Sequence, residues 1–332
     1  YKVTHLLGKG VFGEVYHAVD TQHGDEEVAI KVFFSSNADY SSLADECLAL
    51  GQIEHSSVVK VVELNQTEQS SFLVQELLRG GNLAHWMEKR FNSAQKWFNL
   101  EDIIAVGINV AEALDQAHVK NIFHGDIKPS NICFRDEAHK DPVVVDFGHA
   151  TFQSAIHLDS KIKNPVLEVA TLQYIAPERV GYLKSHNFGA MDLYSLGVIL
   201  YELATGELPI KGETPQDLVG QLYSVIPEPI YSIVPNFPRF LDDIILKLLR
   251  KSPKDRYQSP SGLIMDLKTA LEYIVNGEAD RTSALGRYDT LRELNYKIPL
   301  VGRKLEIKLC HDLIEKTCKG ASTPLMIRAP SS

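Results

Sequence analysis

The feature that most constrains the fold of this chain is a series of short motifs in a fixed order. The glycine-rich run GKGVFGEV begins at Gly8, and VAIK ends at Lys31. HGDIKPSN begins at His124, DFG begins at Asp146, and APE ends at Glu178. A lone G-x-G-x-x-G is weak evidence, because glycine-rich turns occur in ordinary hairpins. Several matches in this order and at workable spacing are far more specific than any one of them.

The N-terminal part of the chain predicts a small antiparallel sheet. Short runs of alternating apolar and polar residues, joined by glycine-containing turns, are typical of strands. Ser41 and Ser42 can cap a helix that ends near Gly51, between the third and fourth of these runs. The expected strands span 1–7, 14–19, 27–34, 58–64 and 70–77.

The pattern becomes helical after Gly80 and Gly81. Asn99 can cap a helix over 100–120, in which the apolar residues recur at helical spacing. A short buried strand is expected at 143–147. Further helices are expected at 191–206, 237–251 and 259–275.

Composition narrows the classes of function. The chain has 332 residues and a net charge of −9 without a long basic run, which argues against nucleic acid or an anionic membrane as a partner. No apolar stretch approaches the ~20 residues that span a bilayer. The cysteines show no CxxC spacing, which favours a reduced, cytoplasmic setting. The chain begins with Tyr1 at a strand, so we expect it to be a piece of a longer protein.

Together the motifs resemble the signature set of protein kinases, over roughly the first four-fifths of the chain. DIKPSN, from Asp126, resembles the serine/threonine-kinase form, and Thr171 lies where that class places a threonine ahead of APE. The resemblance implies an α+β, two-lobed protein-kinase fold. We expect a β-rich N-lobe with one helix at about 1–78 and a mainly helical C-lobe at about 79–275.

The glycine-rich run is expected to lie over the triphosphate of ATP. Glycines lack side chains, so a turn that carries them can present backbone N–H groups to phosphate. The residues concerned are Gly8, Lys9, Gly10 and Gly13. Lys31 would hold the α- and β-phosphates and pair with Glu46 on the predicted N-lobe helix, although Glu46 could instead be a solvated surface residue.

The HGD and DFG motifs supply the expected phosphoryl-transfer groups. Asp126 would be the base or orienting group for the substrate hydroxyl, and Lys128 would neutralise charge on the γ-phosphate. Asn131 and Asp146 would ligate Mg²⁺, since this ion prefers oxygen ligands and keeps waters and phosphates in its shell. Phe147 should pack in an apolar site and control where Asp146 points.

The resemblance also implies an adenine slot. Val15 and Ala29 would form its roof. Cys133 would form its floor, where kinases usually carry leucine or another aliphatic residue. The hinge would supply Gln75, Glu76 and Leu78.

Two contacts are expected to be structural. Glu178 would pair with Arg256 in a buried ion pair, and losing one partner of such a pair costs roughly 3–5 kcal/mol. Asp192 resembles the helix aspartate that anchors the catalytic loop. Gly125 stands where most kinases carry the arginine that meets an activation-loop phosphate. We therefore expect activity without activation-loop phosphorylation.

The C-terminal part shows a second resemblance. Residues 276–298 read as a linker, and 299–332 resemble the start of an AAA/STAND-type ATPase, with VGR before a helix and an apolar strand after it. This order resembles hybrid sensor kinases, which continue into ATPase, GAF and histidine-kinase modules of a phosphorelay. An unrelated C-terminal helix is the alternative.

Three functions remain open on the sequence. The first is an ATP- and Mg²⁺-dependent serine/threonine kinase acting on protein substrates. The second is a nucleotide-binding pseudokinase that regulates attached ATPase and sensor modules, a reading motivated by HGD. The third is a small-molecule kinase, which APE and the full helical lobe after it disfavour.

Overall fold

The structure is a computed structural model. It describes residues 1–9, 13–33, 50–66, 71–93, 97–147, 151–152, 172–180 and 187–289. Residues Tyr1–Leu291 form one compact unit, and Arg292–Ser332 form another, which lies outside the described residues. The expected ATPase segment and most of the expected N-lobe helix therefore fall outside the description.

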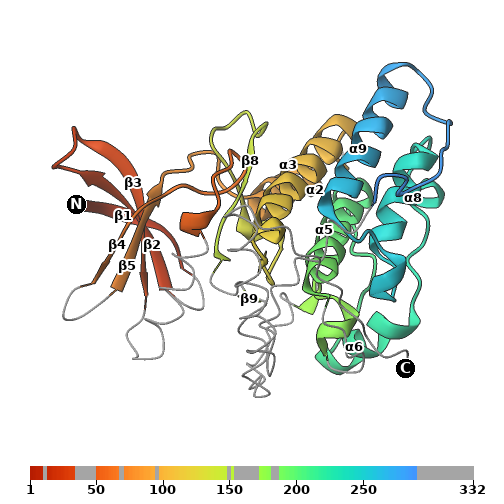
Figure 1. Cartoon of the computed structure of the whole chain (residues 1–332), viewed down its shortest axis with the longest axis horizontal. Helices are drawn as coiled ribbons and strands as arrows, with labels where there is room; N and C mark the ends of the chain where they lie inside the picture. Colours follow the sequence, from red (N-terminus) through yellow and green to blue (C-terminus); the bar gives the residue numbers. More distant parts are fainter. Residues whose placement is uncertain are drawn as a thin grey trace, which may run out of the picture. The chain divides into compact units, whose positions relative to one another are not determined.

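An antiparallel sheet forms the N-lobe, with strand order β1-β2-β3-β5-β4 (Figure 1). The fourth strand begins at Val61, whereas the sequence pattern predicts a start at Val58. Val58 bridges to Val144 instead, and the Val59 N–H donates to the Val144 carbonyl at 3.1 Å. The strands are β1 (Lys2–Lys9), β2 (Gly13–Asp20), β3 (Glu26–Phe33), β4 (Val61–Gln66) and β5 (Ser71–Glu76).

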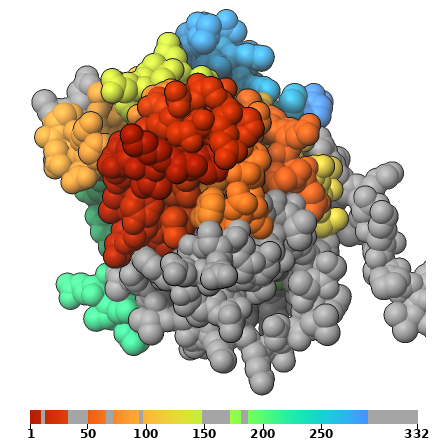
Figure 2. Space-filling model, turned by 90° about the vertical axis from the view of Figure 1, so that its left-hand side faces the viewer, coloured from red at the N-terminus to blue at the C-terminus, as the bar shows by residue number. Residues whose placement is uncertain are grey.

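The sheet buries few apolar side chains. Ala18, Val28, Ile30 and Val74 form a small cluster on one face of β2, β3 and β5. Every residue of β1 is exposed, and the space-filling view shows this first strand, in dark red, at the surface (Figure 2). An edge strand that covers no core gains its stability from backbone pairing with β2.

Helices dominate the C-lobe (Figure 1). α3 packs against both α5 and α9, and α8 packs against α5 and α9. The helices are α2 (Leu83–Phe91), α3 (Leu100–Val119), α5 (Phe188–Thr205), α6 (Pro215–Ser224), α7 (Ile230–Ile233), α8 (Arg239–Leu248) and α9 (Pro260–Val275). Short elements complete the lobe: β6 (Ile122–Phe123), η1 (Pro129–Asn131), β7 (Ile132–Phe134), β8 (Pro142–Val144), β9 (Thr151–Phe152), η3 (Pro177–Val180) and η4 (Pro253–Asp255).

Local signals explain where the main helices begin and end. The Asn99 side chain accepts from the Asp102 N–H at 2.7 Å and so caps α3, as its position before an apolar-periodic run predicts. Gly206 ends α5 at φ 74°, a left-handed conformation that glycine adopts without strain. The amphipathic α8 buries its apolar face, as predicted from the sequence.

The described part of the expected linker packs against the C-lobe. Residues 276–289 belong to the compact unit that continues to Leu291, and the Asp289 carboxylate accepts from the Ser259 N–H at 2.9 Å. The chain therefore remains attached to the C-lobe beyond the end of α9.

Candidate active site

Asp192 on α5 anchors the catalytic loop, which lies between β6 and η1. The Asp192 carboxylate accepts from the backbone N–H groups of His124 at 3.0 Å and Gly125 at 2.8 Å. His118 Nε2, at the end of α3, lies 2.9 Å from the same carboxylate. The predicted anchor is confirmed, and Gly125 takes φ 77° without the strain that a side chain would bring.

The charge on Asp192 is compensated inside the protein. Burial by itself would raise the pKa of this carboxyl, but the hydrogen bond from His118 and the donors of the catalytic loop bring the net pKa below its ordinary value. The side chain is 1% exposed. Asp192 is therefore a carboxylate that stabilises the loop only while it is charged.

His124 orders the loop from within. Its side chain is fully buried, its Nε2 lies 3.1 Å from the Val145 carbonyl, and its Nδ1 accepts from the Asp126 N–H at 3.2 Å. The ring therefore links the start of the catalytic loop to the backbone just before Asp146. One histidine sets the spacing between the two motifs.

Asp126 lies at the centre of a polar cluster. Lys128 Nζ is 2.8 Å from Asp126 Oδ2. The Asn131 amide NH₂ donates to the Asp126 carbonyl at 2.8 Å and to Asp126 Oδ2 at 3.2 Å. The Asp126 and Lys128 side chains are 11% and 25% exposed, so both remain accessible from one side. The structure thus brings together three residues that the sequence analysis singled out.

Asp146 joins the C-lobe to the N-lobe. Lys31 Nζ donates to Asp146 Oδ1 at 2.7 Å, with side chains 10% and 30% exposed. Asp146 has φ 65°, a strained conformation for a non-glycine residue that is typical of functional sites. Phe147 is buried, with its ring centroid 4.5 Å from that of His124, as predicted. Glu46, the expected partner of Lys31, lies outside the described residues.

The donor set fits Mg²⁺ bound together with a nucleotide. The NH₂ of Asn131 donates to Asp126, which leaves the amide oxygen as the atom that could ligate an ion, and Asp146 could supply a carboxylate. In the described part of the chain, no group of three or more His, Cys, Asp or Glu residues could hold a metal. One carboxylate and one amide suit an ion that takes its remaining ligands from phosphates and water.

The glycine-rich strands place the expected phosphate-binding residues at one end of the sheet. Gly8 on β1 pairs with Val15 on β2, and no described atom lies within 4 Å of a Cβ built at Gly8. Packing in the described residues therefore does not require glycine here. Lys9 is exposed and pairs with Glu14 at 3.0 Å, Gly13 begins β2, and Gly10 lies outside the described residues.

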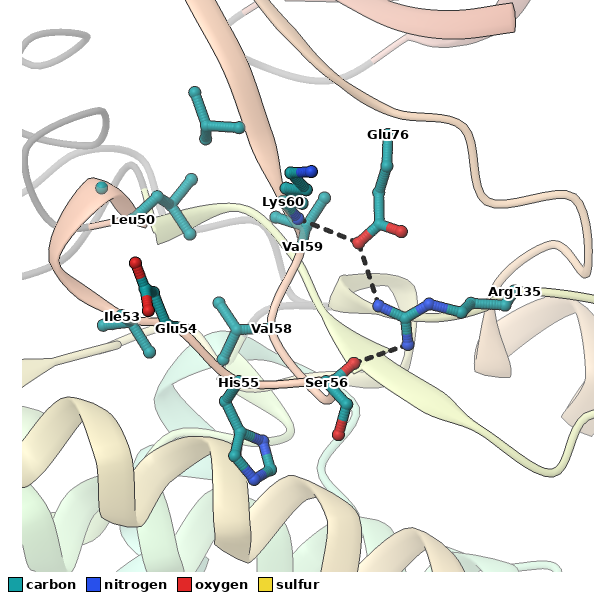
Figure 3. A pocket seen from close by; sticks show the side chains of 12 residues that line it. Leu50, Ile53, Glu54, His55, Ser56, Val58, Val59, Lys60, Glu76 and Arg135 are labelled. Carbon is teal, nitrogen blue, oxygen red and sulfur yellow. Dashed lines mark hydrogen bonds and ion pairs between the residues drawn. The ribbon is translucent and has the colours of Figure 1, made fainter.

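The side chains of the expected hinge residues Gln75 and Glu76 point to opposite faces of the sheet, because the two residues are consecutive on β5. Gln75 and Glu76 on β5 lie opposite Ala29 and Val28 on β3. The Glu76 carboxylate accepts from Arg135 Nη2 at 3.0 Å and from the Lys60 N–H at 2.9 Å (Figure 3). The Glu76 N–H in turn donates to the Lys60 carbonyl at 2.9 Å, so both the side chain and the N–H of Glu76 have partners within the protein.

A cavity of about 580 Å³ lies beside the Glu76–Arg135 ion pair (Figure 3). Glu76 and Arg135 line it together with Leu50, Ile53 and Val59. Among the expected nucleotide-binding residues, Glu76 alone lines this cavity, which is therefore separate from the Lys31–Asp146 pair. Leu78, after the end of β5, is half-buried and packs against the core.

Cys133 is placed as a core-like residue. It lies on β7 opposite Val143 and is half-buried. Burial, and to a smaller extent the Asp146 carboxylate, raises the pKa of the Cys133 thiol to about 12. The thiol is therefore protonated at neutral pH and serves as a small apolar surface.

The predicted Glu178–Arg256 pair is confirmed and fully buried. Arg256 Nη1 and Nη2 donate to the two Glu178 carboxylate oxygens at 2.7 and 2.8 Å, and both side chains are 0% exposed. The remaining Arg256 donors reach the carbonyls of Ala190, Arg250 and Lys251. All five guanidinium N–H groups are engaged, which is what a buried charge requires.

Sequence reasoning missed several supporting residues. His118 shares the Asp192 carboxylate, and Arg135 holds the side chain of Glu76. Tyr174, ahead of APE, donates to Glu202 on α5 at 2.6 Å. These contacts join residues that are far apart in the sequence, so no local sequence pattern predicts them. The only available signal was the position of His118, at the end of a predicted helix that leads into the HGD loop.

A two-lobed structure, with a lysine from the sheet and acidic and amide groups from the helical lobe at one site, defines the kinase class of fold. The family model described as "Protein kinase domain" matches residues 1–267, and the chain therefore belongs to the protein kinase domain family.

Similar proteins include bacterial kinases. Serine/threonine-protein kinase Pkn1 of Myxococcus xanthus is 31% identical over 290 residues, which cover 85% of this chain and 40% of the relative. Probable serine/threonine-protein kinase PknB of Lactococcus lactis is 25% identical over 283 residues (84% and 43%). Serine/threonine-protein kinase PknE of Mycobacterium tuberculosis is 28% identical over 298 residues (89% and 50%). The chain spans half or less of the length of these relatives.

None of the helices in the described ranges combines the length and the apolar character needed to cross a membrane.

Proposed function

We propose that this domain transfers the γ-phosphate of ATP to serine and threonine hydroxyls of protein substrates. The observation that carries the proposal is the Lys31–Asp146 contact of 2.7 Å beside the Asp126, Lys128 and Asn131 cluster. The relatives named serine/threonine-protein kinases support the choice of acceptor.

Each residue of the cluster has a defined task in this reaction. The acceptor hydroxyl oxygen forms a bond to the γ-phosphorus while the bond from that phosphorus to the β,γ-bridging oxygen breaks, and the Asp126 carboxylate takes the hydroxyl proton. Lys128 lies 2.8 Å from Asp126 and would neutralise negative charge on the γ-phosphoryl group during its transfer. Lys31 binds the α- and β-phosphates, and the Gly8 end of the sheet covers them.

Asn131 and Asp146 would hold Mg²⁺, which supplies charge neutralisation on the β- and γ-phosphates when bound. Val15 and Ala29 on the sheet and Cys133 on β7 would enclose the adenine. The Gln75–Leu78 stretch would present its backbone to the base. Glu46 would orient Lys31.

The wider context is also a proposal. The resemblance of 299–332 to an ATPase start supports a larger cytoplasmic sensor kinase in which ATPase and phosphorelay modules follow this domain. Gly125, in place of the usual arginine, favours a second candidate function, a pseudokinase that binds nucleotide and regulates those modules.

A transfer assay with γ-labelled ATP, Mg²⁺ and a generic protein acceptor separates the two candidates. The wild-type chain should label serine and threonine, and Asp126→Asn should not. Nucleotide binding by the wild type without transfer to any acceptor or to itself would reject the kinase and favour the pseudokinase. Removal of Mg²⁺ with a chelator should abolish transfer by the wild type, because Asn131 and Asp146 would lose the ion that they position.

A further inference from the structure

The chain reverses direction after α9 and returns to the start of that helix. We call residues 276–289 the return segment. Gly277 takes φ 74°, the Glu278 N–H donates to the Tyr273 carbonyl at 2.7 Å, and the segment ends at Asp289 beside Ser259, the N-cap of α9. The return segment therefore runs alongside the helix that it follows.

Asp289 makes a dense set of contacts at this point. Its carboxylate accepts from the Gln258 N–H at 2.9 and 3.0 Å, from the Ser259 N–H at 2.9 Å and from the Ser259 hydroxyl at 3.0 Å. A carboxylate also suits the positive end of the α9 dipole. Gly262 leaves room for it, because a Cβ there would lie 2.7 Å from the Asp289 Cα.

A second contact anchors the return segment three residues earlier. The Gly286 N–H donates to Asp266 Oδ2 at 2.7 Å, and the buried Tyr257 hydroxyl donates to the same oxygen at 2.6 Å. Gly286 has φ 69°, a left-handed conformation that glycine adopts without strain. This conformation favours glycine at the turn that brings the Gly286 N–H to Asp266.

Both anchors contact residues of the stretch 256–259. The same stretch binds Glu178, the last residue of the APE motif. Arg256 binds both oxygens of Glu178, Tyr257 is tied through Asp266 to Gly286, and Gln258 is bound by Asp289. The Gln258 side chain further donates to the carbonyls of Pro253 and Arg256 at 2.9 Å. Consecutive residues thus connect Asp289 to the APE glutamate.

We propose that Asp289 is a positioning residue for the protein acceptor: by holding Gln258 and Ser259, it fixes Arg256 and hence residues 172–180 around APE. The inference rests on the proposed kinase function, because in protein kinases the APE segment and the helical lobe after it build the platform for the peptide acceptor. Lys31 and Asp146 make none of the contacts of the 256–259 stretch given above. Asp289 therefore affects acceptor binding and leaves nucleotide binding unchanged.

The test compares steady-state kinetics of the full chain in four forms, at a temperature well below the melting point of each. Asp289→Ala should raise the KM for a peptide acceptor by about fivefold, the effect of losing roughly one net hydrogen bond, with the KM for ATP unchanged. Arg287→Ala, an exposed position of the same segment, is the matched control and should change neither. Asp289→Asn keeps one acceptor oxygen and should restore the peptide KM to within about twofold of the wild type.

An unchanged peptide KM in Asp289→Ala would overturn the inference, even if the melting temperature falls, because the residue would then be only structural. Equal increases of both KM values would overturn it as well. If the wild-type chain transfers no phosphate, the proposed function fails and amide hydrogen exchange decides. Faster exchange over 172–180 in Asp289→Ala than in Arg287→Ala would support the positioning role, and equal exchange would reject it.

Discussion

The N-lobe sheet has a separate cluster of four buried apolar side chains, Ala18, Val28, Ile30 and Val74, whereas the C-lobe helices share one large core that also includes Leu73 of β5. The polar residues differ in the same way. In the C-lobe, Asp192 and Arg256 are almost fully buried and have several partners each. In the N-lobe, Lys31 reaches out of the sheet to Asp146 on the other lobe.

The comparison shows that the two lobes hold their site residues by different means. The catalytic loop is fixed by groups that belong to the same lobe, so its geometry is present before any ligand arrives. Lys31 depends on how the sheet is placed over the C-lobe. We therefore expect substitutions in the C-lobe to affect stability and turnover more than equivalent substitutions in the N-lobe sheet.

The largest effect is expected at Asp126, the proposed base. Asp126→Asn should reduce kcat by about 10³-fold, because the amide cannot accept the hydroxyl proton. The measurement is phosphate transfer from labelled ATP under saturating substrate. Asp136→Asn, an exposed carboxylate in the loop after β7, is the matched control and should leave kcat unchanged. A loss of less than tenfold in Asp126→Asn would show that the C-lobe cluster is not the catalytic group.

The same truncation in each lobe compares the two cores. Ile244→Ala in α8, where the side chain is 0% exposed within the large core, should cost about 4 kcal/mol of unfolding free energy. Ile30→Ala in the small N-lobe cluster should cost about 2 kcal/mol, since fewer buried groups surround the cavity. Urea unfolding measures both. An equal or larger loss at Ile30 would contradict the comparison.

Removal of the charge on Asp192 should show its effect through pH. Asp192→Asn should lower the unfolding free energy by about 2 kcal/mol near neutral pH, because two backbone donors and His118 lose a charged acceptor. The pKa of Asp192 is lowered in the folded state, so its stabilisation is complete above the ordinary aspartate pKa of about 3.9 and disappears as pH falls through the folded value.

Urea unfolding of the wild type and Asp192→Asn from neutral to acidic pH checks this expectation. The difference between the two proteins should shrink below about pH 4, where the Asp192 carboxyl of the unfolded chain takes up a proton, and it should disappear at the lower pH where the folded carboxylate is protonated as well. A difference that is constant with pH would show that Asp192 acts by packing rather than by charge.

The smallest effect is expected in the activation segment. The hydroxyl residues Thr151, Ser154 and Ser160 lie between DFG and APE in the sequence. Combined replacement of these three residues by Ala should change kcat by less than about twofold, because Gly125 offers no cation to a phosphate on these hydroxyls. The transfer assay with phosphatase-treated and untreated wild type completes the measurement. A large loss in the triple variant would mean that a phosphate is received elsewhere.

The parts of the fold and site that local patterns or motifs encode were predictable. Asn99 caps α3, Glu178 pairs with Arg256, and Asp192 holds the catalytic loop, as the sequence indicates. The β4 strand starts late because Val58 bridges to Val144, a pairing between distant segments that a strand pattern does not reveal.

The parts that depend on a few distant contacts were not predictable. The polar composition of 276–289 is that of a linker, yet the Asp289 carboxylate and the Gly286 N–H hold the segment against α9. The contact of Lys31 with Asp146 joins the VAIK and DFG motifs. Each motif by itself predicts phosphate or metal binding, so neither one predicts that the two side chains pair directly. The role of Glu46 beside them stays a prediction.

The most direct test of the central claim, that Lys31 and Asp146 act on one nucleotide, is a double-mutant cycle on MgATP affinity by titration calorimetry. Lys31→Met and Asp146→Asn should each weaken binding by about tenfold or more, the cost of losing a charge-assisted contact. The double variant should bind more tightly than the product of the two single effects predicts, because both residues hold the same ligand. Strictly multiplicative losses, or unchanged affinity in Lys31→Met, would contradict the account.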